Sequence, residues 1–263
     1  MKNLYVLPLL FILIMAAVSG CSKEYSASGI PAKTTPKEDS FNLVINFAPM
    51  VDTLLLNFDS TYTNYWDEDY KVSAFKFYVS NFDLINTDSG RAYHLDTAKY
   101  FLVDAADSTT WTVKLLATPF TYDRISFLIG IDSAHNINNS KKDAFDPAKG
   151  MFWSASAGYI MAKFQGASES GTAFDYQIGG FTGPDNVLRK PTLLFPYGQF
   201  LTVSATAGSQ SIININADAG AWFYNPRQIK IETTPTCTLP GPLAHSISEN
   251  YSNMFSVDTI MAR

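Results

Sequence analysis

From residue 41 onward, short apolar runs rich in β-branched and aromatic residues alternate with clusters of polar turn residues. This pattern is typical of strands, and about a dozen such runs follow one another without an internal repeat of fixed period. The longest run, residues 71–84, contains Ser80-Asn81 and is expected to bend or bulge there. Frequent short strands predict an all-β fold, either a Greek-key β-sandwich or a flattened barrel. The other predicted strands cover residues 42–47, 54–58, 100–104, 111–116, 122–131, 159–164, 174–179, 192–195, 200–205 and 211–216.

Only the end of the chain shows a clear helical period. After Gly241-Pro242, apolar residues recur every three or four positions, as they do along one face of a helix. These residues are Leu243, Ile247, Tyr251, Met254 and Phe255. We therefore expect a C-terminal helix that caps an open end of the sandwich, and one further helical turn at residues 218–224.

One long polar excursion interrupts the strands between residues 132 and 166. Its first part, residues 136–142, holds three Asn, one Ser and two Lys, side chains that favour turns. Residues 146–150 (DPAKG) then predict a rigid corner, because proline fixes its own φ and glycine can adopt a positive φ. A large apolar group, residues 151–153 (MFW), follows directly. A loop of this length is usually functional or disordered, and its aromatic anchor favours a functional loop. The alternative is a long hairpin whose aromatic residues close the end of the barrel.

Four segments of the chain carry motifs that occur together in one protein family. They are residues 75–81 (FKFYVSN), residues 132–166, residues 178–189 (IGGF followed by NVLR) and residues 243–255 (LAHSISENYSNMF). In this order they resemble the methanobactin-partner (MbnP-like) copper-binding proteins, which are common as lipoproteins in Bacteroidetes-type bacteria. Within the second segment the resemblance rests on Asp132, Ser133, His135, Asn136, Asp146, Pro147, Gly150, Met151, Phe152, Trp153, Gly158, Tyr159 and Gly166.

The resemblance implies an MbnP-like β-sandwich domain over residues 41–263 that binds or handles copper, with a di-haem peroxidase-like protein as a partner. Copper sites of the family rest on histidines and, in some members, on an oxidised tryptophan. This chain differs at three such positions. Gln177 replaces a histidine before the IGGF motif, Ala155 replaces a second aromatic residue, and Pro49 replaces a histidine at the end of the early strand.

The first residues predict export and lipidation. Residues 1–3 are basic, residues 4–18 are mostly apolar, and Val-Ser-Gly-Cys21 is a lipobox. We expect residues 1–20 to be a lipoprotein signal peptide and Cys21 to carry the lipid that anchors the protein to a membrane. Residues 21–40 are rich in Ser, Thr, Pro and Lys and predict a flexible lipidated tether. The residues after Cys21 favour the outer membrane, on its periplasmic or cell-surface side.

Charge and cysteine content narrow the functional classes. The net charge is −5, and removal of residues 1–20 would take away one lysine and no acid. Such a chain lacks the basic surface that nucleic-acid binding needs, so no nucleic-acid partner is expected. Lipidation of Cys21 would leave Cys237 alone, which excludes an intramolecular disulfide. Cys237 is then a free thiol, a soft-metal ligand, a dimer bridge or an inert loop cysteine.

The three histidines are too far apart in sequence for a local metal-binding motif. His135, at the start of the polar excursion, is the best single candidate ligand, and the alternative is a surface histidine hydrogen-bonded to the loop. If the segments pack together, His135, His245, Met151 and Cys237 form a soft site for Cu(I), which accepts imidazole, thioether and thiolate ligands. His94 is expected to be an exposed hairpin residue.

The chain carries none of the common hydrolase, phosphate-binding or dinucleotide-binding motifs, so we do not expect an enzyme. The three acids at residues 67–69 could serve acid–base chemistry or hold Ca²⁺, but such a run is usually a solvated loop. The first functional hypothesis is therefore copper binding on a membrane anchor. The alternative is a divergent surface lipoprotein without metal, which binds a glycan or a protein partner through exposed Trp66, Trp111 and Trp153 and nearby tyrosines.

Overall fold

The computed structural model describes residues 41–95, 99–136 and 141–263, and residues Asp39–Arg263 form one compact unit. The predicted signal peptide, the lipidation site Cys21 and the tether of residues 21–40 lie outside the described residues. None of the described helices is long and apolar enough to cross a membrane.

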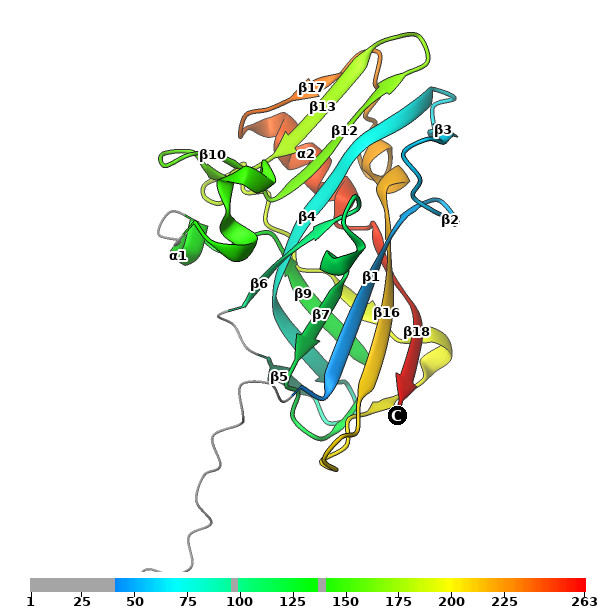
Figure 1. The fold of residues 1–263 in the computed structure, drawn as a ribbon, viewed down its shortest axis with the longest axis vertical. Coiled ribbons are helices and arrows are strands. Elements are labelled where there is room, and N and C mark those ends of the chain that lie inside the picture. Colours follow the sequence, from blue (N-terminus) through cyan, green and yellow to red (C-terminus); the bar gives the residue numbers. More distant parts are fainter. Residues whose placement is uncertain (1–40, 96–98, 137–140) are drawn as a thin grey trace, which may run out of the picture. The chain divides into compact units, whose positions relative to one another are not determined.

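The first sheet joins five strands of the described chain. Its order is β18-β16-β1-β2, with β7 also paired to β1, and Figure 1 shows β16 between β1 and β18. Strand β1 runs parallel to β16 and antiparallel to β2 and β7. Alternate residues of β1 are buried, as its sequence pattern requires for a sheet with one face toward the core. The strands are β1 (Leu43–Val51), β2 (Leu54–Leu55), β7 (Thr112–Leu115), β16 (Ser211–Asp218) and β18 (Phe255–Ala262).

The second sheet joins nine described strands around the long strand β4 (Asp69–Asn86). The pairing register of β4 shifts between Ser80 and Asp83, and Asn81 has a φ of 48°, so the predicted bend at Ser80-Asn81 is confirmed. The other strands are β3 (Thr61–Thr63), β5 (Arg91–His94), β6 (Tyr100–Asp104), β9 (Arg124–Ile129), β12 (Ala162–Ser168), β13 (Ala173–Ile178), β14 (Thr192–Leu194) and β17 (Thr236–Cys237). Two short pairs complete the strands: β8 (Thr121–Tyr122) with β15 (Leu201–Thr202), and β10 (Phe152–Ser154) with β11 (Gly158–Tyr159).

An aromatic core lies between the two sheets. The ring of Phe47 on β1 contacts Phe127 edge to face at 5.5 Å and Phe77 at 6.1 Å, and Phe255 on β18 contacts Phe127 at 4.9 Å. Edge-to-face pairs stabilise a core by about 0.5–1.5 kcal/mol each beyond the burial of their area. The predicted all-β sandwich class is confirmed.

The helices are short, and one prediction about them is wrong. The C-terminal helix exists as α2 (Pro242–Tyr251), and it packs against the core through buried residues such as Ile247 and Tyr251. It ends before Phe255, which belongs to β18 rather than to the helical stripe, because residues 255–262 pair with β16. The predicted turn after β16 is confirmed as η5 (Ala219–Phe223). The other helical segments are η1 (Ser108–Thr110), α1 (Ser133–Asn136), η2 (Asp143–Phe145), η3 (Pro147–Lys149) and η4 (Pro196–Gly198).

Candidate functional site

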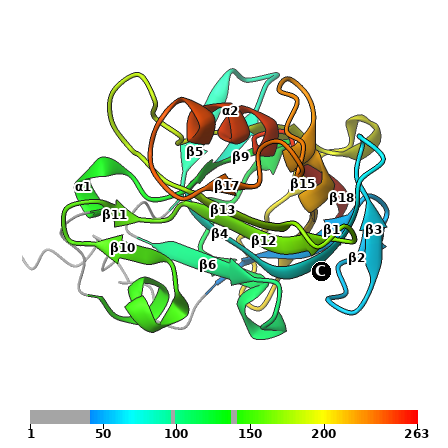
Figure 2. The same ribbon diagram turned by 90° about the horizontal axis from the view of Figure 1, so that it is seen from above.

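The polar excursion folds back onto strand β4. Figures 1 and 2 show α1 and β10 together at one side of the unit and β2 and β3 at the opposite side. Three polar residues of the β4 motif hold this segment. Tyr78 donates from its hydroxyl to the carbonyl of Ala144 (2.7 Å), Ser80 donates to the carbonyl of Gly130 (2.9 Å), and Asn81 donates to Asp132 Oδ2 (3.3 Å). The first and second motif segments therefore form one structure.

His135 sits in a cluster of polar groups at the start of α1. Its Nδ1 lies 2.8 Å from Asp132 Oδ1 and 2.7 Å from the Tyr100 hydroxyl, and Tyr100 donates to the other carboxylate oxygen of Asp132. Burial alone would raise the pKa of Asp132, but hydrogen bonds from Tyr100, His135 and Asn81 lower it below its ordinary value. Burial and the bond to Asp132 raise the pKa of Tyr100. Asp132 is thus an anionic acceptor, which favours a proton on Nδ1 of His135.

Asn136 connects two parts of the motif from inside the protein. It is fully buried, its Oδ1 accepts from the backbone N–H of Tyr159 (2.8 Å), and its Nδ2 lies 3.9 Å from the sulfur of Met161. A Cβ atom on Gly158 would lie 2.1 Å from Asn136 Oδ1, and Gly158 has a φ of 78°. Asn136 and Gly158 therefore act together to close α1 onto β11.

The predicted corner at residues 146–150 is present and is held by lysines from the second sheet. Asp146 caps η3 by accepting from the N–H of Ala148 (2.9 Å), and Gly150 is left-handed with a φ of 70°. Lys163 donates to the carbonyl of Gly150, and Lys76 donates to the carbonyl of Lys149 (3.3 Å). The corner is therefore hydrogen-bonded both within itself and to the second sheet.

Trp153 lies against the end of β13 rather than in solvent. Its indole N–H donates to Gln177 Oε1 (2.9 Å), and the amide of Gln177 donates to Asp175 Oδ2 (2.9 Å). A Cβ atom on Gly179 would lie 2.5 Å from the Trp153 ring, so the glycine of the IGGF motif leaves room for the indole. Gln177 is therefore the direct partner of Trp153.

The structure does not assemble the four predicted copper ligands into one site. His135 lies on α1 and His245 on α2, whereas Met151 is fully buried and Cys237 is buried on β17. Burial, with a contribution from Asp175, raises the pKa of the Cys237 thiol to about 11, so the thiol stays protonated at neutral pH. Within residues 41–95, 99–136 and 141–263, no group of three or more His, Cys, Asp or Glu residues is placed to hold a metal ion.

Comparison with known protein families establishes the family of this chain. The family model MbnP matches residues 40–239 of the chain. The chain belongs to the MbnP family. Among solved structures, MbnP from Methylosinus trichosporium is similar at a TM-score of 0.48 and 12% identity, over 81% of this chain and 96% of that one. No curated protein sequence matches.

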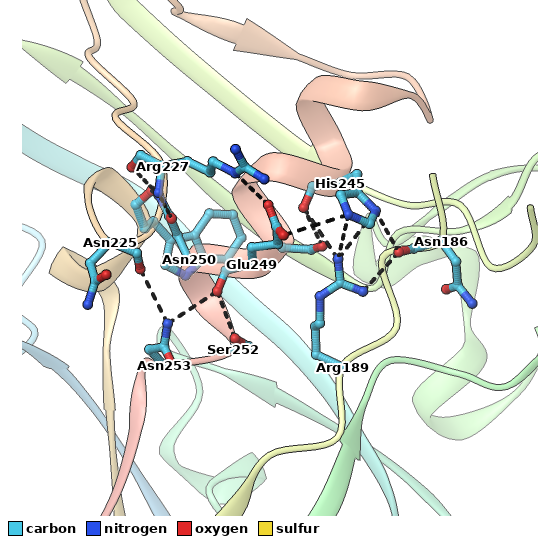
Figure 3. A network of polar contacts seen from close by, with 11 residues as sticks. Asn186, Arg189, Asn225, Arg227, His245, Glu249, Asn250, Ser252 and Asn253 are labelled. Carbon is cyan, nitrogen blue, oxygen red and sulfur yellow. Dashed lines mark hydrogen bonds and ion pairs between the residues drawn. The ribbon is translucent and has the colours of Figure 1, made fainter. Parts of the chain in front are cut away.

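The MbnP match ends before α2, and the polar contacts of α2 show what its residues do (Figure 3). The guanidinium of Arg189 lies 3.4 Å and 3.5 Å from the two ring nitrogens of His245, and the carbonyl of Asn186 lies 3.2 Å from His245 Nδ1. Asn250 accepts from the N–H of Arg227 (2.8 Å) and donates to the carbonyl of Trp222 (3.0 Å). His245 thus connects α2 to the segment that follows the IGGF motif, and Asn250 connects it to η5 and to Arg227.

The tryptophans predicted to be exposed in this MbnP chain are half-buried, and that prediction is wrong. The indole N–H of Trp66 donates to the carbonyl of Phe223 (2.7 Å), and that of Trp111 donates to the carbonyl of Asp104 (2.9 Å). Other aromatic residues are exposed, Tyr197 and Phe200 among them, and two of these exposed residues form a pair: Tyr65 and Tyr224, which are 67% and 36% exposed. Their rings stack at 4.9 Å with an interplanar angle of 15°. Sequence reasoning missed this pair because its members come from loops far apart in the chain.

Proposed function

We propose that this MbnP-family chain is an extracytoplasmic copper-binding protein, anchored to the outer membrane through Cys21, which acts by binding rather than by catalysis. Membership of the MbnP family carries the proposal. A di-haem peroxidase-like protein is the partner that the family resemblance suggests. The structure supports the proposal at one residue, His135.

His135 fits the role of a copper ligand, whereas the other predicted ligands do not join it. A metal-binding histidine usually donates its second ring N–H to a carboxylate or carbonyl, which fixes its tautomer and orientation. Asp132 accepts at Nδ1 of His135 in this way. His245 lies against a guanidinium, whose positive charge opposes a bound cation. We therefore assign coordination to His135 rather than to His245.

The test is an anaerobic Cu(I) competition titration of residues 22–263, which contain the whole compact unit. His135→Ala is compared with His94→Ala, a matched control because His94 Nδ1 also pairs with an aspartate, Asp83. We expect one equivalent of Cu(I) in the wild type and in His94→Ala, and none in His135→Ala. An intact-mass measurement reports any oxidised tryptophan. Cu(I) binding no stronger than the chelator background would contradict the proposal, and so would equal binding by all three proteins.

The membrane anchor has a separate test. In cells that process lipoproteins, Cys21→Ala is expected to move the protein from the membrane fraction to the soluble fraction. Ser22→Ala serves as the control, because it leaves the proposed acylation site intact. Membrane association of Cys21→Ala equal to that of the wild type would rule out an anchor at this residue.

The second candidate function is recognition of a glycan, and the stacked pair Tyr65–Tyr224 favours it. The ring of Trp66 packs edge to face against that of Tyr65, with centroids 5.1 Å apart. The Nζ of Lys230 lies over the Trp66 ring, 5.1 Å from its centroid. An exposed aromatic face can pack on the apolar face of a sugar ring. Titration with neutral oligosaccharides should then change the tyrosine and tryptophan fluorescence of the wild type and not that of Tyr65→Ala. No change in either protein would remove this candidate.

A further inference from the structure

Two carboxylates meet where the first sheet ends, at the start of η5. Asp52 lies in the turn after β1, and Asp218 ends the neighbouring strand β16 and caps η5. Asp218 Oδ1 accepts from the backbone N–H of Asp52 (2.9 Å) and from that of Gly220 (2.8 Å). Parallel pairing of β1 with β16, with Met50 opposite Asp218, brings these residues together.

The side chains of the two aspartates converge on the same small space. A Cβ atom on Gly220 would lie 3.1 Å from Asp218 Oδ1 and 3.3 Å from Asp52 Oδ1. Burial raises the pKa of Asp218, and the negative charge of Asp52 raises it further, against the two backbone hydrogen bonds. Two neighbouring carboxylates repel each other when both are ionised. A cation bound between them would remove this repulsion and stabilise the ionised pair.

A buried hydroxyl without a partner belongs to the same region. Tyr70 on β4 is fully buried, and its hydroxyl has no hydrogen-bond partner among the residues that the structure describes. Its ring packs on Phe223 at the end of η5, with centroids 5.1 Å apart. After burial, the charges of Asp218 and then Asp52 are the strongest influences that raise the pKa of Tyr70. Buried hydroxyls are normally hydrogen-bonded, so an unpartnered one indicates a missing ligand or water.

We infer that Asp52, Asp218 and the hydroxyl of Tyr70 form a binding site for a divalent cation that prefers oxygen ligands, with Ca²⁺ as the best fit. Ca²⁺ takes carboxylate and neutral oxygen ligands in irregular geometries, often with water completing the shell. One cation accounts for the carboxylate pair and for the hydroxyl, which it binds directly or through a coordinated water. A water molecule alone would satisfy the hydroxyl but leave the two carboxylates opposed.

Thermal unfolding of residues 22–263 with Ca²⁺ and with a chelator tests the inference. A ligand that binds only the folded state raises Tm, and a shift of about 3 °C is expected at Ca²⁺ concentrations well above Kd. The shift should disappear in Asp52→Asn, which retains the fold because Asp52 is exposed and asparagine tolerates its φ of 55°. Asp59→Asn removes an exposed acid that is not one of the proposed ligands, so it should keep the shift and is the matched control.

Binding of Tb³⁺, read by luminescence sensitised through the nearby aromatic residues, measures the same site without relying on stability. Asp218→Asn retains an oxygen for both backbone N–H groups and should lower Tb³⁺ affinity at least about tenfold, as should Asp52→Asn. Tyr70→Phe should lower it less. A Tm of the wild type that does not depend on Ca²⁺ overturns the inference, and so does Tb³⁺ binding that is unchanged in both aspartate variants.

Discussion

The two histidines predicted as ligands in different segments, His135 and His245, have opposite surroundings. The ring of His135 is bonded to an anionic carboxylate and a tyrosine hydroxyl. The ring of His245 lies against the guanidinium of Arg189, and Glu249 Oε1 is 3.9 Å away. Their positions in the sequence make both histidines candidates for copper, whereas the side chains around them in the structure favour a cation at His135 and not at His245. The remaining role of His245 is to connect α2 to the segment of Arg189.

The central segment depends on one buried contact, so Gly158→Ala should have the largest effect on stability. The new Cβ atom would fall 2.1 Å from Asn136 Oδ1 at a backbone φ of 78°, and we expect a loss of about 3 kcal/mol in the free energy of unfolding. Denaturant unfolding measures it. Gly171→Ala is the control, because it has a similar φ of 93° with nothing within 4 Å of the Cβ position, and it should cost about 1 kcal/mol. Equal losses of stability in the two variants would show that Asn136 shifts away from the new Cβ atom at no cost.

Helix α2 is held by a buried side chain, Asn250, and its removal should cause the second-largest loss of stability. Asn250→Ala removes three hydrogen bonds of a fully buried amide, to Arg227 N–H, Arg227 carbonyl and Trp222 carbonyl. We expect a loss of about 2 kcal/mol in urea or guanidinium unfolding, because buried groups lose their partners. Asn253→Ala, whose side chain is exposed and bonded at 3.3 Å, should lose less than about 1 kcal/mol. If Asn250→Ala and Asn253→Ala lose the same free energy of unfolding, the hydrogen bonds of Asn250 do not hold α2.

A third prediction concerns copper affinity and separates the two histidines directly. Asp132→Asn should weaken Cu(I) binding about 10- to 100-fold, since the carboxylate that orients His135 becomes a neutral amide. Glu249→Gln makes the corresponding change beside His245 and should leave Cu(I) affinity unchanged. Competition titration of both variants measures the difference. A loss of affinity in Glu249→Gln would move the site to α2.

Much of the fold follows from local signals in the sequence. Short apolar runs rich in β-branched residues predict β1 and β16, and Ser80-Asn81 predicts the bend of β4, because strand propensity and turn chemistry are set by residues close together in the chain. The corner at Asp146 is predicted for the same reason. Phe255 was assigned to the helix because its spacing fits a helical stripe, although its pairing with β16 could not be seen locally.

The candidate site is less predictable, because it depends on contacts between distant segments. The partner of Trp153 is Gln177, the partner of His245 is Arg189, and neither pair has a signature in spacing. Tyr70 lies just before the predicted strand of residues 71–84, and nothing in the sequence singles it out until its hydroxyl is seen without a partner among the described residues. Motif resemblance placed residues 132–166 in the MbnP family, but only the packed structure separates its structural residues, such as Asn136, from His135.

The smallest expected effect is a pH dependence that arises from Asp132. Hydrogen bonds hold the pKa of this carboxyl below its ordinary value in the folded state, although burial opposes them. A lowered pKa stabilises the fold above the unfolded-state pKa of about 4, and this stabilisation is lost as the pH falls through the lower, folded-state pKa. Because the carboxylate is partly exposed and screened, we expect at most about 1 kcal/mol.

Urea unfolding of the wild type and Asp132→Asn between pH 7 and pH 3 measures this contribution. The wild type should lose its advantage over the variant as the pH falls, and the two stabilities should converge at the acidic end. Asp59→Asn, which removes an exposed carboxyl without these partners, should run parallel to the wild type. Parallel curves for Asp132→Asn would mean that Tyr100 and Asn81 do not stabilise the anion. The contrast with His245 would then rest on the guanidinium of Arg189 alone.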